Sequence, residues 1–153
     1  DNRAYLDTVC RRFEKVLKGA AMMTETEVEI IEEKKVDNKI PVLTLNDLVM
    51  KQAEELHAPQ LAPAREKTGS TDFGNVMRRV PGTCARIAFV DPGAAAHSQE
   101  YIAAGKTDAA HDAVVYGAKI LAGTALELIE DPELLNRVKT EFKENLAKEN
   151  SEV

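Results

Sequence analysis

Apolar and polar positions along the first 35 residues predict a helix followed by a strand. In the first stretch, apolar side chains recur at three- and four-residue steps and so share one stripe: Tyr5, Leu6, Val9, Cys10, Phe13, Val16 and Leu17. This spacing predicts an amphipathic helix that ends at Gly19. From residue 24 to residue 35 the period changes to two, with Val28 and Ile30 on one side and glutamates on the other. Such alternation predicts a strand with one exposed face.

The middle of the chain predicts a linker, a helix, a long loop and a second strand. Residues 36–42 (VDNKIPV) break the alternation and have the character of a linker. A helix is predicted over residues 44–56, with Thr44 as its N-cap. Residues 57–72 are rich in proline and small polar residues, which predicts a loop. The apolar run at 86–90 (RIAFV) predicts a strand that is buried on both faces.

Two helices are predicted in the last third. The first runs from about Asp108 to Ile129, and its alanines, together with Gly117 and Gly123, permit close packing against a sheet or another helix. The second begins at Asp131 and Pro132, an N-cap residue followed by a proline suited to the first turn.

Composition narrows the class of protein. The chain has 153 residues, a formal net charge of -6 and an isoelectric point near 5.2, which argues against a nucleic-acid partner because such proteins carry a basic face. No apolar run approaches the roughly 18 residues of a membrane helix. Two cysteines in unrelated contexts, Cys10 and Cys84, are typical of reduced thiols in a cytoplasmic protein. Because the chain starts at Asp1 without a methionine, we expect it to be part of a longer polypeptide.

His97 is the first candidate for chemistry, because it follows a glycine and three alanines in the stretch DPGAAAHSQEY. Imidazole is a common metal ligand, and small neighbours would let a metal and a substrate approach the backbone. Glu100, three residues later, could support the histidine from outside the coordination sphere. From spacing alone, a solvated histidine at a helix start is the alternative. The remaining histidines, His57 and His111, fit structural roles, and no HExxH, paired CxxC, GxSxG, P-loop or GxGxxG motif occurs.

The second candidate is the segment GSTDFGN, residues 69–75. A glycine followed by two hydroxyls and an aspartate makes a turn with many backbone donors, and such a turn can hold a carboxylate or a phosphate. By pattern alone an ordinary helix cap is the favoured interpretation, with Ser70, Thr71 or Asp72 accepting free backbone N–H groups.

Together these motifs resemble the C-terminal part of the M20 metallopeptidase and amidohydrolase family, and most closely the branch of the aminobenzoyl-glutamate hydrolase B subunit. The likeness extends over residues 68–142, through GSTDFGNVMRRVPGT and then AHSQEYIAAGKTDAAHDAVVYGAK onward. It implies an α/β fold: residues 1–36 would be the last helix and strand of an inserted α+β lid that dimerises. Residues 37–153 would be the C-terminal half of a catalytic domain with helices packed on a sheet.

The resemblance also implies a site. A complete catalytic domain holds two divalent metals, zinc or in some members manganese, and the last ligand in the chain matches His97. The substrate carboxylate would lie against the turn, whose candidate contacts are Gly69, Ser70 and Thr71, with Asp72 and Asn75 holding that turn.

The departures from the family pattern are equally informative. Nothing in this sequence matches the HxD and paired-glutamate motifs, so the general base and the other metal ligands would lie in a missing N-terminal half. We therefore expect a hydrolase of an N-acyl amino acid or an aminobenzoyl-glutamate-like amide, inactive as this chain alone. Its partners would be that missing half and, through the lid, a second subunit as a homodimer or heterodimer. A non-catalytic partner subunit and a dimerising interaction module descended from the enzyme are the alternatives.

Overall fold

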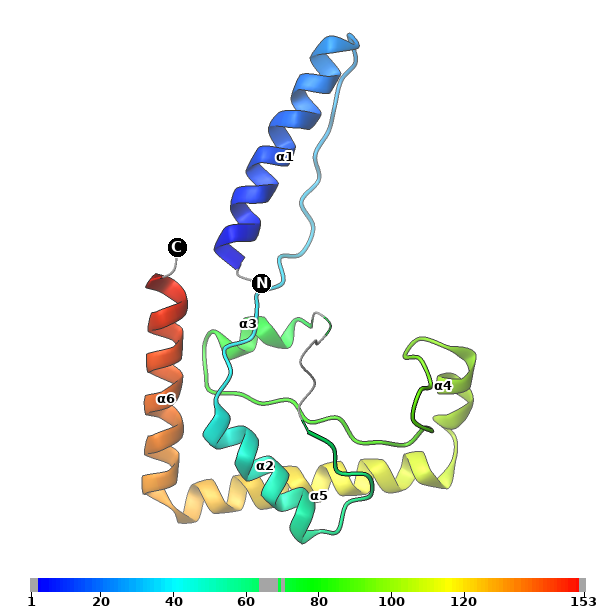
Figure 1. The fold of residues 1–153 in the computed structure, drawn as a ribbon, viewed down its shortest axis with the longest axis vertical. Coiled ribbons are helices and arrows are strands. Elements are labelled where there is room, and N and C mark those ends of the chain that lie inside the picture. The colour runs from blue at the N-terminus through cyan, green and yellow to red at the C-terminus, as the bar shows by residue number, and fades with distance from the viewer. Residues whose placement is uncertain (1–2, 64–68, 70, 152–153) are drawn as a thin grey trace.

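A computed structural model describes residues 3–63, 69 and 71–151, and Figure 1 shows their arrangement. The helices are α1 (Arg3–Met23), α2 (Leu43–Glu55), α3 (Phe73–Met77), α4 (Gln99–Ala104), α5 (Asp108–Glu130) and α6 (Pro132–Ser151). Helices α2, α5 and α6 pack on one another and form the body, from which α1 projects. None of the helices in the described part is long and apolar enough to cross a membrane.

Helix α1 and the extended segment after it form an arm (Figure 1). No residue of α1 is buried. The predicted end at Gly19 is wrong, because the helix continues through two alanines to Met23. It ends where Glu25 adopts a left-handed conformation with φ of +53°, and the Thr24 hydroxyl donates to the Ala20 carbonyl at 2.9 Å. The arm therefore has little apolar support from the body.

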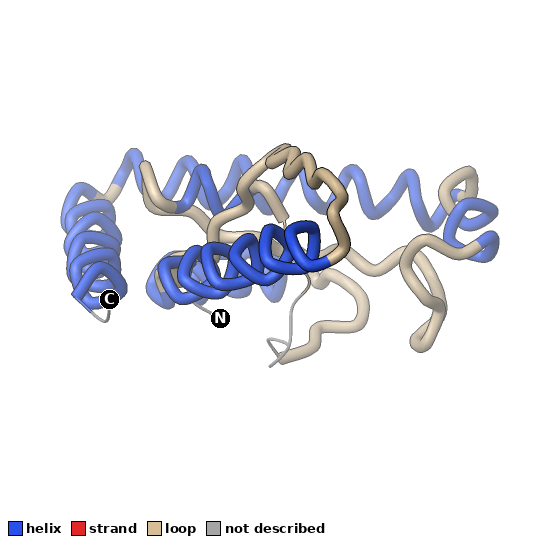
Figure 2. The backbone as a smooth tube through the Cα atoms, turned by 90° about the horizontal axis from the view of Figure 1, so that it is seen from above, coloured by secondary structure: helices blue, strands red, loops and turns tan. Residues whose placement is uncertain are grey.

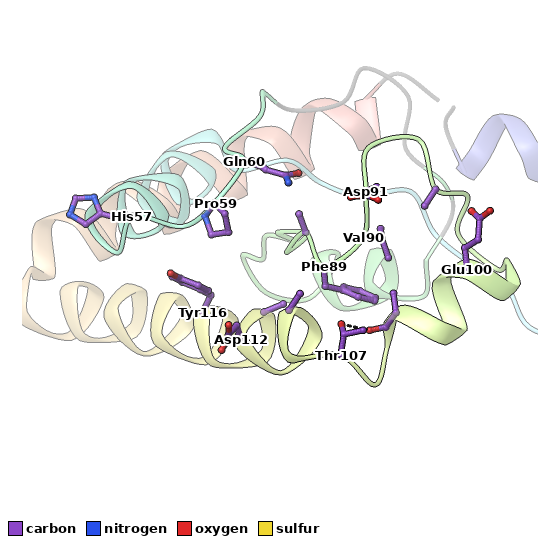
Figure 3. A pocket seen from close by; sticks show the side chains of 15 residues that line it. His57, Pro59, Gln60, Phe89, Val90, Asp91, Glu100, Thr107, Asp112 and Tyr116 are labelled. Carbon is purple, nitrogen blue, oxygen red and sulfur yellow. Dashed lines mark hydrogen bonds between the residues drawn. The ribbon is translucent and has the colours of Figure 1, made fainter.

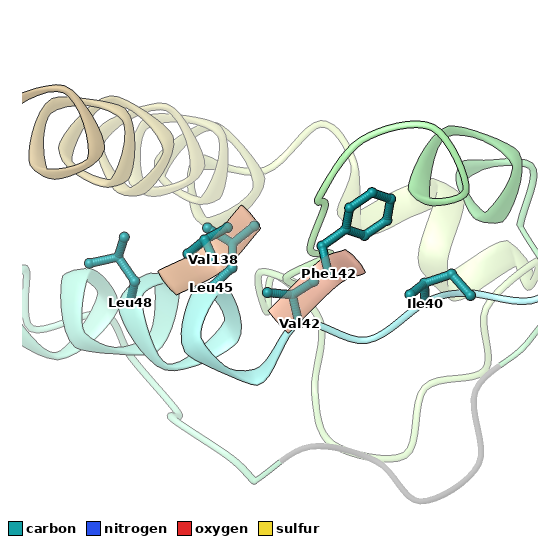
Figure 4. Packing of buried hydrophobic residues seen from close by; sticks show 6 residues of the cluster. All are labelled: Ile40, Val42, Leu45, Leu48, Val138 and Phe142. Atoms are coloured by element: carbon teal, nitrogen blue, oxygen red, sulfur yellow. The ribbon is translucent and has the colours of Figure 1, made fainter. Parts of the chain in front are cut away.

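The core of the body lies between α2 and α6 (Figure 4). Its buried side chains come from the end of the linker, from α2 and from α6: Ile40, Val42, Leu45, Leu48, Val138 and Phe142. A second, smaller cluster joins Val49 and Ala53 of α2 to Ile120 of α5. Helix α2 thus supplies apolar side chains to both clusters.

Capping agrees with the prediction at α6 and differs from it at α2. Asp131 accepts the backbone N–H of Leu134 at 2.9 Å, which confirms it as the cap of α6. Helix α5 is capped by Thr107, whose hydroxyl accepts the N–H of Ala110 at 3.3 Å. The prediction of Thr44 as the cap of α2 is wrong: the N-cap position is Val42, which has no side-chain acceptor.

The predicted α/β fold, with helices packed on a sheet, is wrong for the described residues, because they contain six helices and no strand (Figure 2). Residues 24–35 are extended and exposed on both sides, with Ile31 at 74%. Residues 86–90 are also irregular, and only Ile87 packs against the smaller apolar cluster. A strand requires a neighbouring backbone for its hydrogen bonds, which an alternating sequence cannot supply by itself. The domain boundary at 36/37 stays a prediction.

Candidate functional site

His97 lies in an exposed turn that leads into α4. Its φ of +64° is left-handed, a conformation that residues other than glycine adopt infrequently. The next residue, Ser98, fixes the helix start, because its hydroxyl accepts the N–H of Tyr101 at 3.1 Å. The structure therefore presents the imidazole on a short anchored turn, with Glu100 exposed in the first turn of α4. The role of His97 as a ligand stays a prediction.

An open cavity of about 740 Å³ lies beside this turn, between α5 and the irregular segments that precede α4 (Figure 3). Its charged and aromatic lining residues are His57, Phe89, Asp91, Glu100, Asp112 and Tyr116. Phe89 is held by an edge-to-face contact with the Tyr101 ring, with centroids 4.8 Å apart. Among the described residues that line the cavity, none is lysine or arginine. Three carboxylates without a cation give a negative potential that attracts cations and disfavours anions.

Of the GSTD segment, Thr71 and Asp72 lie directly before α3, and neither of them lines this cavity. The Thr71 hydroxyl accepts the N–H of Phe73 at 3.3 Å, and the Thr71 carbonyl accepts that of Gly74 at 3.2 Å. Gly69 is exposed, and no atom lies within 4 Å of the position a Cβ would take there. Ser70 lies outside the described residues. The backbone of Gly69 is thus accessible, as contact with a carboxylate would require.

The side chains of Asp72 and Asn75 contact residues 34–37, and their role in holding the turn stays a prediction. The Asp72 carboxylate pairs with the Lys34 ammonium at 2.8 Å. The hydrogen bond from Lys34, and then its charge, hold the pKa of Asp72 below its usual value. The Asn75 amide binds the backbone of Lys35 and Asp37, each at 3.1 Å. The backbone N–H of Asn75 donates to the Asp72 carbonyl at 3.0 Å.

A zinc centre does not fit these residues by themselves. Within residues 3–63, 69 and 71–151, no group of three or more histidine, cysteine, aspartate or glutamate side chains could hold a metal ion. Catalytic zinc requires three protein ligands, and the turn before α4 offers one imidazole. Any metal bound through His97 would need ligands from outside the part of the chain that the structure describes.

Most of the residues that line the cavity were not predicted from the sequence as site residues. Asp112 and Tyr116 are four residues apart on α5, so they share one helix face. That spacing could have indicated from the sequence that the two side chains line the same site. No local pattern connects them with His57, which follows α2, or with Asp91, which precedes α4. His57 approaches them through the packing of α2 on α5, and Asp91 lines the cavity from the irregular segment between α3 and α4.

Comparison with known proteins gives a partial likeness. The chain is 33% identical over 148 residues to a mouse protein named Xaa-Arg dipeptidase, covering 94% of this chain and 34% of the relative. It is 39% identical over 82 residues to the human protein of that name, covering 54% of this chain and 19% of the relative. The chain therefore spans about a third of the length of the mouse relative and about a fifth of the length of the human one. No protein-family profile matches it, and neither does any solved structure.

These relatives are peptidases by name, and the likeness supports the predicted resemblance to the M20 peptidases at that level. The likeness does not support the narrower assignment to the aminobenzoyl-glutamate branch. Zinc binding and dimer formation stay predictions.

Proposed function

We propose that this chain is the C-terminal part of an M20-type, metal-dependent peptidase or amidohydrolase. The observation that carries the proposal is the likeness to a dipeptidase over 94% of the chain. It is supported by a histidine on an anchored, exposed turn next to a cavity that could hold a substrate. We further propose a cytoplasmic location.

In the complete enzyme, His97 would provide one ligand to a metal pair, zinc or manganese, and the remaining ligands and the general base would come from outside these 153 residues. The chain's own contribution is binding and orientation. The turn at Gly69–Thr71 would receive a substrate carboxylate, and the cavity would receive a substrate side chain.

The charge of the cavity lining favours one of two candidate substrate classes under this proposal. Asp91, Glu100 and Asp112 would repel the second carboxylate of aminobenzoyl-glutamate and attract a guanidinium group. We therefore place a dipeptide with a C-terminal arginine first, in keeping with the names of the relatives, and aminobenzoyl-glutamate second.

Metal content and hydrolysis by the longest natural form of the polypeptide test this proposal. The His97→Ala variant should lose metal and rate together, whereas His111→Ala, an exposed histidine on α5, should keep both. If the long form holds no metal and cleaves neither substrate, the peptidase proposal fails.

A specific observation favours an interaction role as the second candidate. Large apolar side chains are exposed on two helices: Val9, Phe13 and Val16 on α1, and Val114, Leu121 and Ile129 on α5. Apolar surface of this extent is typical of faces that another polypeptide covers. A homodimer or heterodimer through the arm, and the missing N-terminal half against α5, are the proposed occupants. Sedimentation of the chain over a range of concentrations tests the first, and co-purification with the N-terminal half tests the second.

A further inference from the structure

The junction between the arm and the linker, residues 34–37, receives polar contacts from one short segment, Asp72–Asn75. The Asn75 side chain acts on it as a neighbouring strand would: its Oδ1 accepts the N–H of Asp37 at 3.1 Å, and its Nδ2 donates to the carbonyl of Lys35 at 3.1 Å. A primary amide carries one donor and one acceptor group and so matches both backbone groups. Asparagine is therefore suited to bind the backbones of Lys35 and Asp37 at once.

Gly74 brings the two backbones together. It is buried, and a Cβ at this position would overlap the Asp37 carbonyl oxygen and lie 2.9 Å from the carbonyl carbon. The atoms it would meet are backbone atoms, which cannot rotate out of the way. Glycine at this position is thus required for the approach of α3 to the linker.

Two flanking contacts extend the same attachment. On one side, Lys34 pairs with Asp72 at 2.8 Å. On the other, the side-chain Oδ1 of Asn38 accepts the N–H of Arg3 at 3.1 Å and a hydrogen bond from the Arg78 guanidinium at 3.0 Å. The start of α1, the linker and the end of α3 therefore meet at Asn38.

We propose that Gly74 and Asn75 are positioning residues that clamp the linker and couple the orientation of the arm to the turn at Thr71 and Asp72. The clamp and the turn share one backbone, since the Gly74 N–H donates to the Thr71 carbonyl and the Asn75 N–H donates to the Asp72 carbonyl. A change in the orientation of the arm would therefore displace the backbone of residues 71–75 through their contacts with Lys35 and Asp37. The part of the inference that concerns substrate rests on the proposed function, whereas the clamp itself does not.

The chain carries convenient probes for the clamp, because both of its cysteines are exposed. Cys10 lies on the arm and Cys84 in the body, next to Thr83, whose hydroxyl donates to the Asn46 side chain. Spin labels on these two cysteines, read by double electron–electron resonance, report the arm-to-body distance. The parent and the control Asn136→Ala, an exposed asparagine on α6, should give one narrow distribution. Asn75→Ala should lose that single peak and give a broad one.

A conservative variant keeps the test decisive. Asn75→Asp retains the acceptor for the Asp37 N–H and loses the donor to Lys35. It should therefore preserve the slow hydrogen exchange of the Asp37 amide, which Asn75→Ala should lose. A loss of helical circular dichroism in Asn75→Ala would mean that this variant is partly unfolded. The hydrogen exchange of the Asp37 amide in Asn75→Asp then serves as the test of the clamp. An unchanged distance distribution in folded Asn75→Ala, or fast Asp37 exchange in folded Asn75→Asp, overturns the clamp.

Coupling to substrate is read separately in the long form. Asn75→Ala should raise KM for a dipeptide with a free carboxylate and leave KM for its C-terminal amide unchanged, because only the free carboxylate would contact the turn. Equal changes for the two substrates would overturn the coupling, while the distance measurement would still stand. An inactive long form would contradict the proposed function. The clamp would still be tested, because the distance measurement does not depend on activity.

Discussion

Glu141 in α6 accepts the backbone N–H of Leu43, the first residue of α2, at 2.6 Å, although 98 residues separate them in sequence. The second carboxylate oxygen of Glu141 accepts the N–H of Thr44 at 3.0 Å. Two of the free donors that every helix has at its N-terminus are thus satisfied by another helix. The negative charge also lies at the positive end of the α2 dipole.

Replacing Glu141 with alanine is expected to lower the free energy of unfolding by about 1–3 kcal/mol, because two helix donors lose a charged acceptor. Urea denaturation followed by circular dichroism measures the change. Glu144→Ala, an exposed glutamate one turn later on the same helix, is the control and should be nearly neutral. Equal effects for the two variants would contradict the capping role.

Stability should also depend on pH through Glu141. Burial alone would raise the pKa of this carboxyl, but hydrogen bonds from Thr44 and Leu43 outweigh it, so the net pKa lies below the usual 4.5. A group whose pKa is lower in the folded state stabilises that state above its unfolded pKa, and the contribution is lost as pH falls through the folded pKa. The stability difference between the parent and Glu141→Gln, followed from about pH 6 to pH 3, should therefore shrink as pH falls. A constant difference would contradict this assignment.

Gly123 on α5 provides a test of helix packing. A Cβ there would overlap Oε1 of Gln52, a buried residue of α2 whose amide donates to Glu127 at 2.5 Å. Gly123→Ala should displace Gln52 from Glu127 and destabilise the body by about 1–2 kcal/mol, despite the better helix propensity of alanine. Gly19→Ala is the matched control, because nothing lies within 4 Å of its Cβ position, and it should be neutral or stabilising by up to about 1 kcal/mol. Thermal unfolding of the two variants distinguishes these outcomes.

The 153-residue chain alone should not bind zinc tightly, because the described residues lack a three-ligand group. Equilibrium dialysis against zinc, followed by elemental analysis, measures the stoichiometry, with His97→Ala in parallel. Tight binding of one zinc per chain that His97→Ala abolishes would contradict this prediction.

Features that depend on neighbouring residues were predictable, and those that depend on distant ones were not. Asp131 and Leu134 are three residues apart, so their capping contact follows from sequence. The acceptor for Thr44 is 97 residues away, and no local pattern points to it. The alternation around Val28 and Ile30 indicated a strand, yet alternation specifies only which side chains share a face, and pairing requires a second backbone.

The same limit applies to the candidate site. The exposed turn that carries His97, with Ser98 at the start of α4, follows from the small residues before it. The acidic cavity does not, because Asp91 and Asp112 belong to different segments that approach each other only through folding.

The shape of the arm has a consequence for how the molecule opens. The polar contacts at Arg3 and the linker restrain the base of α1, while Phe13 and Val16 further along are 60% and 65% exposed. Such a helix can unwind without disturbing the apolar core between α2 and α6. Native-state hydrogen exchange should then reveal two cooperative units, with the amides near Phe13 exchanging far sooner than those near Val138. A polypeptide that binds α1 only when it is helical would slow hydrogen exchange of the α1 amides by mass action. The extent of this slowing would report the affinity of that polypeptide.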